Sequence, residues 1–245
     1  MPSSAHLIGM PASARILALV ALIWYGTPAA IALPSGVGPT PESQETAAGS
    51  EPFGRRTSVA LPTELSEASA NWADLRSRIL TERRTIDVCR AADDACSSAA
   101  RRFLSVVALG QQSQGRARLG VINRAVNLSI KPTSDWSQYG VEDFWSAPLA
   151  TLGAGAGDCE DYAIVKYVAL LEIGVATDDL RLVIVRDLKH QTNHAVVAIR
   201  WDERWLILDN RTLIIANAEE LPHYQPLLVL DQQGVRAPAT AFVGR

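Results

Sequence analysis

The stretch "GDCEDYAIVKYVALLEIG", residues 157–174, joins an acidic start to an apolar helical pattern. One face of that helix would carry Ala163, Ile164, Tyr167, Val168 and Leu171. Asp158 is a residue type that begins helices, and Gly174 is a type that ends them. The stretch therefore predicts one helix that starts beside Cys159.

Cys159 would lie in the first turn of this helix. Free backbone N–H groups and the positive end of the helix dipole favour a thiolate there. Asp158, Glu160 and Asp161 have the opposite effect, because nearby carboxylates disfavour a second negative charge. Either Cys159 is inert, or something neutralises the acids around it.

Three strand patterns follow the helix: "LRLVIVRD" at 180–187, "HAVVAIRW" at 194–201 and "RWLILDN" at 204–210. A helical half followed by strands predicts an α+β fold rather than alternating units. If the turn between the last two strands is centred on Trp201 and Asp202, His194 lies directly opposite Asp209. A turn centred on Asp202 and Glu203 would misplace this pair.

With that register, Cys159, His194 and Asp209 form a candidate catalytic triad. His194 would take the thiol proton, Asp209 would orient the imidazole, and Cys159 would attack a carbonyl to form an acyl-enzyme. The Cys159 backbone N–H is the first candidate oxyanion donor. Each residue alone is more often structural, and His190 and His223 are competing histidines.

The region before residue 157 is expected to be mostly helical. Apolar residues recur at helical spacing within 61–84, 97–112 and 115–130. Residues 131–157 are interpreted as a long loop with one helical turn at its end. Its aromatic residues would either wall a substrate cleft or anchor the loop in the core: Trp136, Tyr139, Phe144 and Trp145.

The N-terminus is typical of a secretory signal peptide over residues 1–32, with cleavage after Ala32. Its apolar run is shorter than the roughly 20 residues that span a bilayer, so no stable membrane insertion is expected. Residues 33–60, rich in Pro, Gly, Ser and Thr, predict a disordered leader. A single domain is then expected at 61–245, with a helical part at 61–130 and a catalytic core at 131–245.

Composition limits the partners and the compartment. A formal net charge of -3 without a basic stripe argues against nucleic acid. Export places the protein in the periplasm or outside the cell, where disulfides form. Cys89 and Cys96 are expected to form one, which leaves Cys159 without a partner.

The run 157–174 and the three strand patterns resemble the bacterial transglutaminase-like cysteine proteinases, from about Arg116 to Asn210. The resemblance also covers "VINRAVN" and "VEDFW". It implies a papain/transglutaminase-like core, with the helix that carries the cysteine packed on an antiparallel sheet, and a triad of Cys159, His194 and Asp209. It also implies Ca²⁺ bound by acids that flank the cysteine. The candidate ligands are Asp158, Glu160, Asp161 and Asp143.

The expected function is an exported, calcium-dependent cysteine endopeptidase. Its substrate would be a surface adhesin or another periplasmic protein, and the resemblance suggests a membrane-bound inhibitory receptor as a partner. Two alternatives stay open. The same triad could transfer the acyl group to an amine, as transglutaminases do, or the cleft could bind a peptide without cleaving it.

Overall fold

The computed structural model describes residues 51–54, 61–92, 94 and 96–238. The predicted signal peptide and most of the predicted leader lie outside the described residues. Within the leader, Phe53 is buried, with 5% of its surface exposed. No described helix combines the length and the apolar character that crossing a membrane requires.

The three predicted N-terminal helices are confirmed as α1 (Pro62–Ala91), α2 (Ser98–Gln112) and α3 (Ala117–Ser129). The first two begin where a side chain can satisfy a free backbone group. The Leu61 N–H donates to Glu64, and the Ser97 hydroxyl accepts from the Ala100 N–H. The predicted disulfide joins Cys89, at the end of α1, to Cys96.

Residues 131–157 contain more structure than the predicted loop. They form α4 (Asp135–Tyr139) and α5 (Pro148–Ala154), and the strands β1 (Lys131–Pro132) and β2 (Ala156–Gly157) pair in parallel. The interpretation as one loop with a single turn is therefore wrong. Gly140 and Gly155 end the two helices at φ values of 73° and 64°, so each helix is too short to show apolar periodicity.

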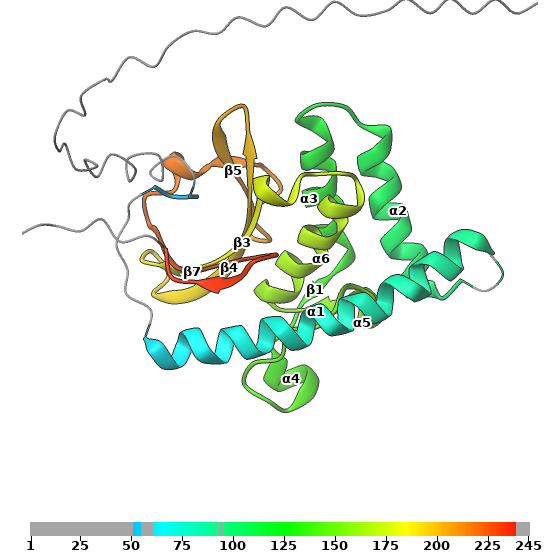
Figure 1. Ribbon diagram of the computed structural model, residues 1–245, viewed down its shortest axis with the longest axis horizontal. Helices are drawn as coiled ribbons and strands as arrows, with labels where there is room; N and C mark the ends of the chain where they lie inside the picture. The colour runs from blue at the N-terminus through cyan, green and yellow to red at the C-terminus, as the bar shows by residue number, and fades with distance from the viewer. Residues whose placement is uncertain (1–50, 55–60, 93, 95, 239–245) are drawn as a thin grey trace, which may run out of the picture. The chain divides into compact units, whose positions relative to one another are not determined.

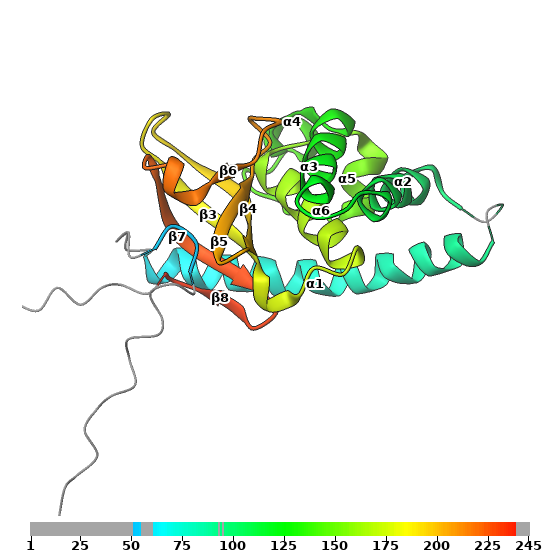
Figure 2. The same ribbon diagram turned by 90° about the horizontal axis from the view of Figure 1, so that it is seen from above.

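The predicted helix at the cysteine is α6 (Cys159–Glu172), and it packs on the sheet. That sheet is antiparallel and six-stranded, in the order β6-β5-β4-β3-β7-β8. Figures 1 and 2 show the helices gathered on one side of it, with α1 running past both layers. The strands are β3 (Leu180–Asp187), β4 (Thr192–Trp201), β5 (Arg204–Leu208), β6 (Ala216–Asn217), β7 (Tyr224–Asp231) and β8 (Gly234–Arg236), with 3-10 turns at Thr177–Asp179 and Ala218–Glu220. The α+β class is confirmed.

Each face of the sheet carries its own apolar cluster. On β4, Ala195 and Val197 join the cluster shared with the helices, whereas Val196 and Ala198 join a second cluster. This alternation follows from the period of two along a strand. The second cluster also holds Tyr224, at the start of β7.

The turn between β4 and β5 is centred on Asp202 and Glu203, and Trp201 pairs with Arg204. The predicted turn at Trp201 and Asp202 is therefore wrong. Asp202 and Glu203 have φ values of 48° and 61°, the left-handed conformation that two-residue hairpins favour at both central positions. Asp tolerates this conformation better than a bulky Trp does.

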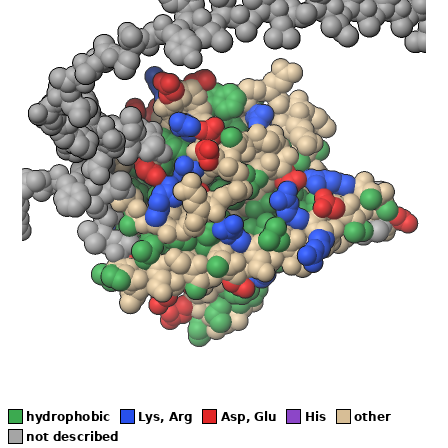
Figure 3. Space-filling model, viewed as in Figure 1, with side chains coloured by type: hydrophobic (Ala, Val, Ile, Leu, Met, Phe, Trp, Pro, Cys, Tyr) green, Lys and Arg blue, Asp and Glu red, His purple; other side chains and the backbone are tan. Residues whose placement is uncertain are grey.

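A groove of about 270 Å³ lies between α1 and α6, far along α6 from Cys159. Apolar and basic side chains lie side by side along α1 on the face drawn in Figure 3. The groove residues include Trp72, Arg76, Leu80, Arg83, Tyr167 and Leu171.

Candidate active site

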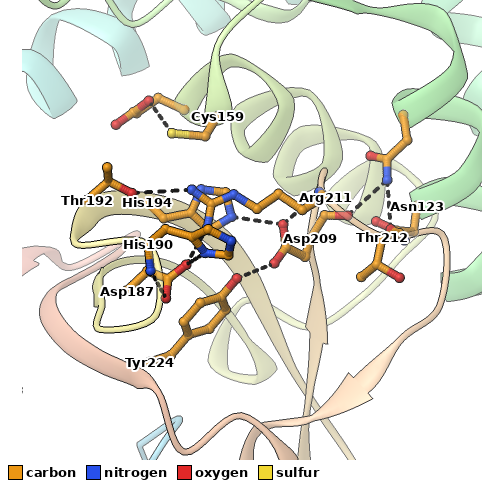
Figure 4. Close-up of polar contacts among 12 residues, drawn as sticks. Asn123, Cys159, Asp187, His190, Thr192, His194, Asp209, Arg211, Thr212 and Tyr224 are labelled. Atoms are coloured by element: carbon orange, nitrogen blue, oxygen red, sulfur yellow. Dashed lines mark hydrogen bonds and ion pairs between the residues drawn. The ribbon is translucent and has the colours of Figure 1, made fainter.

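His194 and Asp209 form a buried hydrogen-bonded pair at the end of the sheet, with His194 Nε2 2.8 Å from Asp209 Oδ1 (Figure 4). Asp209 Oδ1 also accepts from the Arg211 N–H at 2.9 Å, and Oδ2 accepts from the Tyr224 hydroxyl at 2.7 Å. Burial alone would raise the pKa of Asp209, but His194 and these donors lower it to about 2. The carboxylate therefore stays ionised at neutral pH.

The other ring nitrogen of His194 is available. Nδ1 is buried and has no hydrogen-bond partner among the described residues. With its Nε2–H donated to Asp209, the neutral imidazole keeps a lone pair on Nδ1. His194 is thus prepared to accept a proton on the side away from Asp209.

Cys159 shares a pocket with His194. In Figure 4, Cys159 extends from α6 above His194, and its sulfur is turned towards the carboxylate of Glu160. The pocket is open and has a volume of about 420 Å³. It is lined by Pro132, Thr133, Ser134, Gly157, Asp158, Cys159, His194, Asn210 and Arg211.

The Cys159 thiol donates to Glu160 Oε2 at 2.9 Å. Burial, followed by the charge of Glu160, raises the pKa of Cys159 above its ordinary value, even though Ala195 lowers it. The expectation that the helix start alone would favour a thiolate is therefore not met in this arrangement. Desolvation and a neighbouring carboxylate outweigh the helix dipole.

Three acids meet beside the pocket. Asp135, Asp158 and Asp161 each place one ligand oxygen within 4.8 Å of the others. Each also has one buried oxygen without a hydrogen-bond partner among the described residues: Asp135 Oδ1, Asp158 Oδ1 and Asp161 Oδ2. Unpaired buried carboxylate oxygens are costly, and a hard cation takes such ligands.

The pKa values of these acids reflect the same crowding. Burial, followed by the charges of Glu160, Asp135 and Asp161, raises the pKa of Asp158 to about 9. Burial also raises the pKa of Asp161 to about 7, although the Ser146 N–H donates to it and acts in the opposite direction. The group holds more negative charge than its surroundings compensate, which fits a site for a divalent cation.

The four predicted metal ligands lie in different places. Asp158 and Asp161 belong to the group of three acids. Glu160 accepts from the Cys159 thiol, and its charge raises the pKa of Asp158, so it borders the group. Asp143 lies outside it, and its oxygens accept from Asn71 Nδ2 and Trp145 Nε1, each at 3.0 Å.

Asp135 was not identified from the sequence, because it comes from a separate element. Pairing of Pro132 with Gly157 brings the start of α4 next to the start of α6. Gly157 is required by this close approach, since a Cβ there would lie 2.5 Å from Asp161 Oδ2. An Asp that follows a Ser N-cap, as Asp135 follows Ser134, was the available signal, but it is a common one.

The aromatic residues predicted to wall the cleft do not line the pocket at Cys159, so that prediction is wrong for this pocket. Trp145 is buried in the core, as the alternative expected. Trp136 is 68% exposed, and Tyr139 and Phe144 pack on each other near the surface.

Comparison with known proteins agrees with this geometry. Residues 83–226 match the family described as bacterial transglutaminase-like cysteine proteinase. LapG of Legionella pneumophila is similar in structure, with a TM-score of 0.53 and 22% identity, over 64% of this chain and 87% of that one. Its calcium-bound structure gives a TM-score of 0.52 and 21% identity, over 65% of this chain and 91% of that one. Its EGTA-treated structure gives a TM-score of 0.53 and 22% identity, over 64% of this chain and 86% of that one.

At such identities the likeness to LapG shows a shared fold. No curated protein matches the chain. The family match covers more than half of the sequence and includes the cysteine, the histidine and the aspartate. The chain therefore belongs to the bacterial transglutaminase-like cysteine proteinases and is a cysteine peptidase.

Proposed function

We propose that this peptidase is an exported, calcium-dependent endopeptidase in which Cys159 is the nucleophile, His194 the general base and Asp209 the orienting acid. The observation that carries the proposal is the buried bond from His194 Nε2 to Asp209 Oδ1. It leaves Nδ1 as the free proton acceptor in a pocket that also contains Cys159.

Catalysis begins with proton transfer from the Cys159 thiol to His194 Nδ1, and the ionised Asp209 stabilises the imidazolium that forms. The sulfur then attacks the scissile carbonyl. Because Cys159 is the first residue of α6, its backbone N–H is free of the helix ladder and can donate to the developing oxyanion. His194 returns the proton to the leaving amine, and water releases the acyl group from Cys159.

Asp135, Asp158 and Asp161 would hold the calcium ion, and their unpartnered buried oxygens support this assignment. When bound, the ion supplies positive charge next to the thiol. LapG has both a calcium-bound and an EGTA-treated structure, which supports the choice of metal. Glu160 also takes part in activation of the thiol, because the hydrogen bond from Cys159 to Glu160 must break before His194 can accept the proton.

The proposed compartment is the periplasm or the cell exterior. The Cys89–Cys96 disulfide supports this, because disulfides persist in oxidising compartments. The substrate class is a protein in that compartment. A surface adhesin as the substrate and a membrane-bound receptor as the inhibitory partner remain proposals that rest on the family resemblance.

A peptide library prepared from a digested proteome tests the activity. The chain from Leu33 onward is incubated with the library in calcium or in EGTA, and new peptide ends are identified by mass spectrometry. We expect cleavage in calcium, loss of cleavage in EGTA, and none with Cys159→Ala. Cleavage by Cys159→Ala at the rate of the unsubstituted protein would overturn the proposal. Cross-linked products in place of water-added ends would indicate acyl transfer instead of hydrolysis.

A further inference from the structure

Asp209 lies one residue beyond the last residue of β5, Leu208, whose pairing with Val197 ends the β4–β5 ladder. Backbone pairing within this ladder therefore does not fix Asp209, and side chains from other elements contact it instead. We propose that Tyr224 of β7 and Asn127 of α3 are positioning residues that set Asp209 against His194. This inference rests on the proposed function, because it assigns a role relative to the proposed triad.

Tyr224 holds the carboxylate oxygen that His194 does not use. Its hydroxyl donates to Asp209 Oδ2 at 2.7 Å, while Oδ1 accepts from His194. The Tyr224 ring is buried and packs edge-on against Phe53, with ring centroids 6.2 Å apart, and lies 5.8 Å from the His194 ring. A hydroxyl on so constrained a ring fixes the rotation of the carboxylate about its own axis.

Asn127 holds the backbone of the same segment. Its Nδ2 donates to the carbonyl oxygens of Asp209 and Thr212, at 2.9 Å each. Asn123, one turn earlier on α3, is fully buried and donates to the Thr212 carbonyl at 3.0 Å. Figure 4 shows Asn123 pointing towards Thr212. The two amides stand four residues apart and thus share one helix face.

The motif "VINRAVN", residues 121–127, therefore has a physical role in this fold. An apolar residue in place of Asn127 would leave the Asp209 carbonyl without this donor, whereas the Thr212 carbonyl would still accept from Asn123. The carboxylate would then be free to shift relative to the imidazole, and small misplacements of catalytic groups reduce turnover strongly.

The first test compares Tyr224→Phe with Tyr162→Phe. Tyr162 is also buried and donates its hydroxyl to the Ile130 carbonyl, so each variant removes a buried tyrosine hydroxyl that donates a hydrogen bond. With the best-cleaved library peptide as substrate, Tyr224→Phe should lower kcat by about tenfold to a hundredfold and change KM by less than about twofold. Tyr162→Phe should leave both within about twofold of the unsubstituted enzyme.

A spectroscopic signal tests positioning without a substrate. In protein labelled with ¹⁵N-histidine, the His194 Nε2–H should exchange slowly with water, because it is buried and bonded to a carboxylate. Tyr224→Phe should accelerate that exchange by about tenfold, and Tyr162→Phe should not. Equal exchange and equal kcat in the two variants would overturn the inference.

Asn127→Ala, with the exposed Arg124→Ala on the same helix as its control, keeps the test decisive if Tyr224→Phe does not fold. It should lower kcat with little change in KM, whereas Arg124→Ala should change neither. Cys159→Ala is measured alongside. If Cys159→Ala retains activity, the proposed function fails. If Cys159→Ala is inactive while Tyr224→Phe and Asn127→Ala match their controls, only the positioning inference fails.

Discussion

His194 and Asp209 form a 2.8 Å hydrogen bond although they do not oppose each other across β4 and β5. Extending the ladder beyond Val197 and Leu208 would place Asp209 opposite residue 196, two positions from His194. Residues two apart on a strand point to the same face, and such diagonal neighbours lie within reach of long side chains. The pair therefore forms by a diagonal contact. The observed register differs by two positions from the predicted one, and this difference keeps both side chains on the same face of the sheet.

Asp209→Asn should retain the fold and lose most of the activity. The amide cannot stabilise the imidazolium and favours the wrong His194 tautomer, so kcat should fall by about a hundredfold to ten-thousandfold. Steady-state kinetics on a library-derived peptide measures this, and circular dichroism checks the fold. A variant that keeps the unsubstituted kcat would show that Asp209 has no catalytic role.

Asp158→Asn and Asp143→Asn test whether calcium binds at the group of three acids or at the neighbouring Asp143. Calcium should raise the melting temperature of the unsubstituted protein, because a ligand that binds the folded state stabilises it. Asp158→Asn should lose this response, since Asp158 belongs to the group. Asp143→Asn should keep it, because both Asp143 oxygens already accept hydrogen bonds from Asn71 and Trp145. The reverse pattern would place the metal at Asp143.

Gly157→Ala should weaken the response to calcium. Its Cβ would lie 2.5 Å from Asp161 Oδ2, so Asp161 must move away from the group. Gly120→Ala is the matched control, because no atom lies within 4 Å of its Cβ and the site is inside α3. That change should stabilise the fold by up to about 1 kcal/mol. A calcium titration followed by thermal unfolding tests both, and an unchanged calcium response in Gly157→Ala would contradict the predicted geometry.

The stability of the metal-free protein should depend on pH through the same acids. Asp158 and Asp161 have folded-state pKa values of about 9 and about 7, above their ordinary value of 3.8. Between these limits the folded state binds more protons than the unfolded chain, so stability falls as pH rises. In EGTA the melting temperature should decline from about pH 4 to about pH 7, and calcium should flatten the decline. Above about pH 7 the buried Lys166 acts in the opposite direction, because burial lowers its folded-state pKa to about 7. A melting temperature that rises across this window in EGTA would contradict the assignment.

The disulfide should contribute to stability but not to catalysis. Cys89 and Cys96 are seven positions apart, and closing so short a loop should contribute about 2.5 kcal/mol to the free energy of unfolding. The double variant Cys89→Ser, Cys96→Ser should therefore unfold at lower denaturant concentration. Its kcat should match that of the unsubstituted protein. A large loss of activity in folded protein would tie the disulfide to the site.

Much of the fold can be predicted from the sequence, because periodicity identifies long elements well. The apolar stripe of α6 and the β-branched runs of β3 and β4 made these elements visible. The short helices α4 and α5 were missed, since five and seven residues are too few to establish a period. The β4–β5 turn was misplaced because Asp202 and Glu203 adopt left-handed backbone without a glycine.

Site residues that are marked by their local sequence position could be predicted. Site residues that are brought in by the packing of distant elements could not. Cys159 is marked by its place at a helix start, and His194 and Asp209 by their places at strand ends. Asp135 reaches the acids of α6 only through the two-residue β1–β2 pairing, which no local pattern predicts. Tyr224 meets Asp209 because β7 returns beside β3, and this topology is also invisible in the sequence.

The most direct measurement of the proposed mechanism is the mass of the covalent intermediate. The protein is mixed with its best-cleaved peptide in calcium, quenched in acid within the first turnover, and digested for mass spectrometry. We predict that the N-terminal part of the substrate is attached to Cys159 as a thioester, and that the adduct is absent with His194→Ala. Substrate cleavage at an unchanged rate without Cys159, or an adduct on another residue, would contradict catalysis by Cys159.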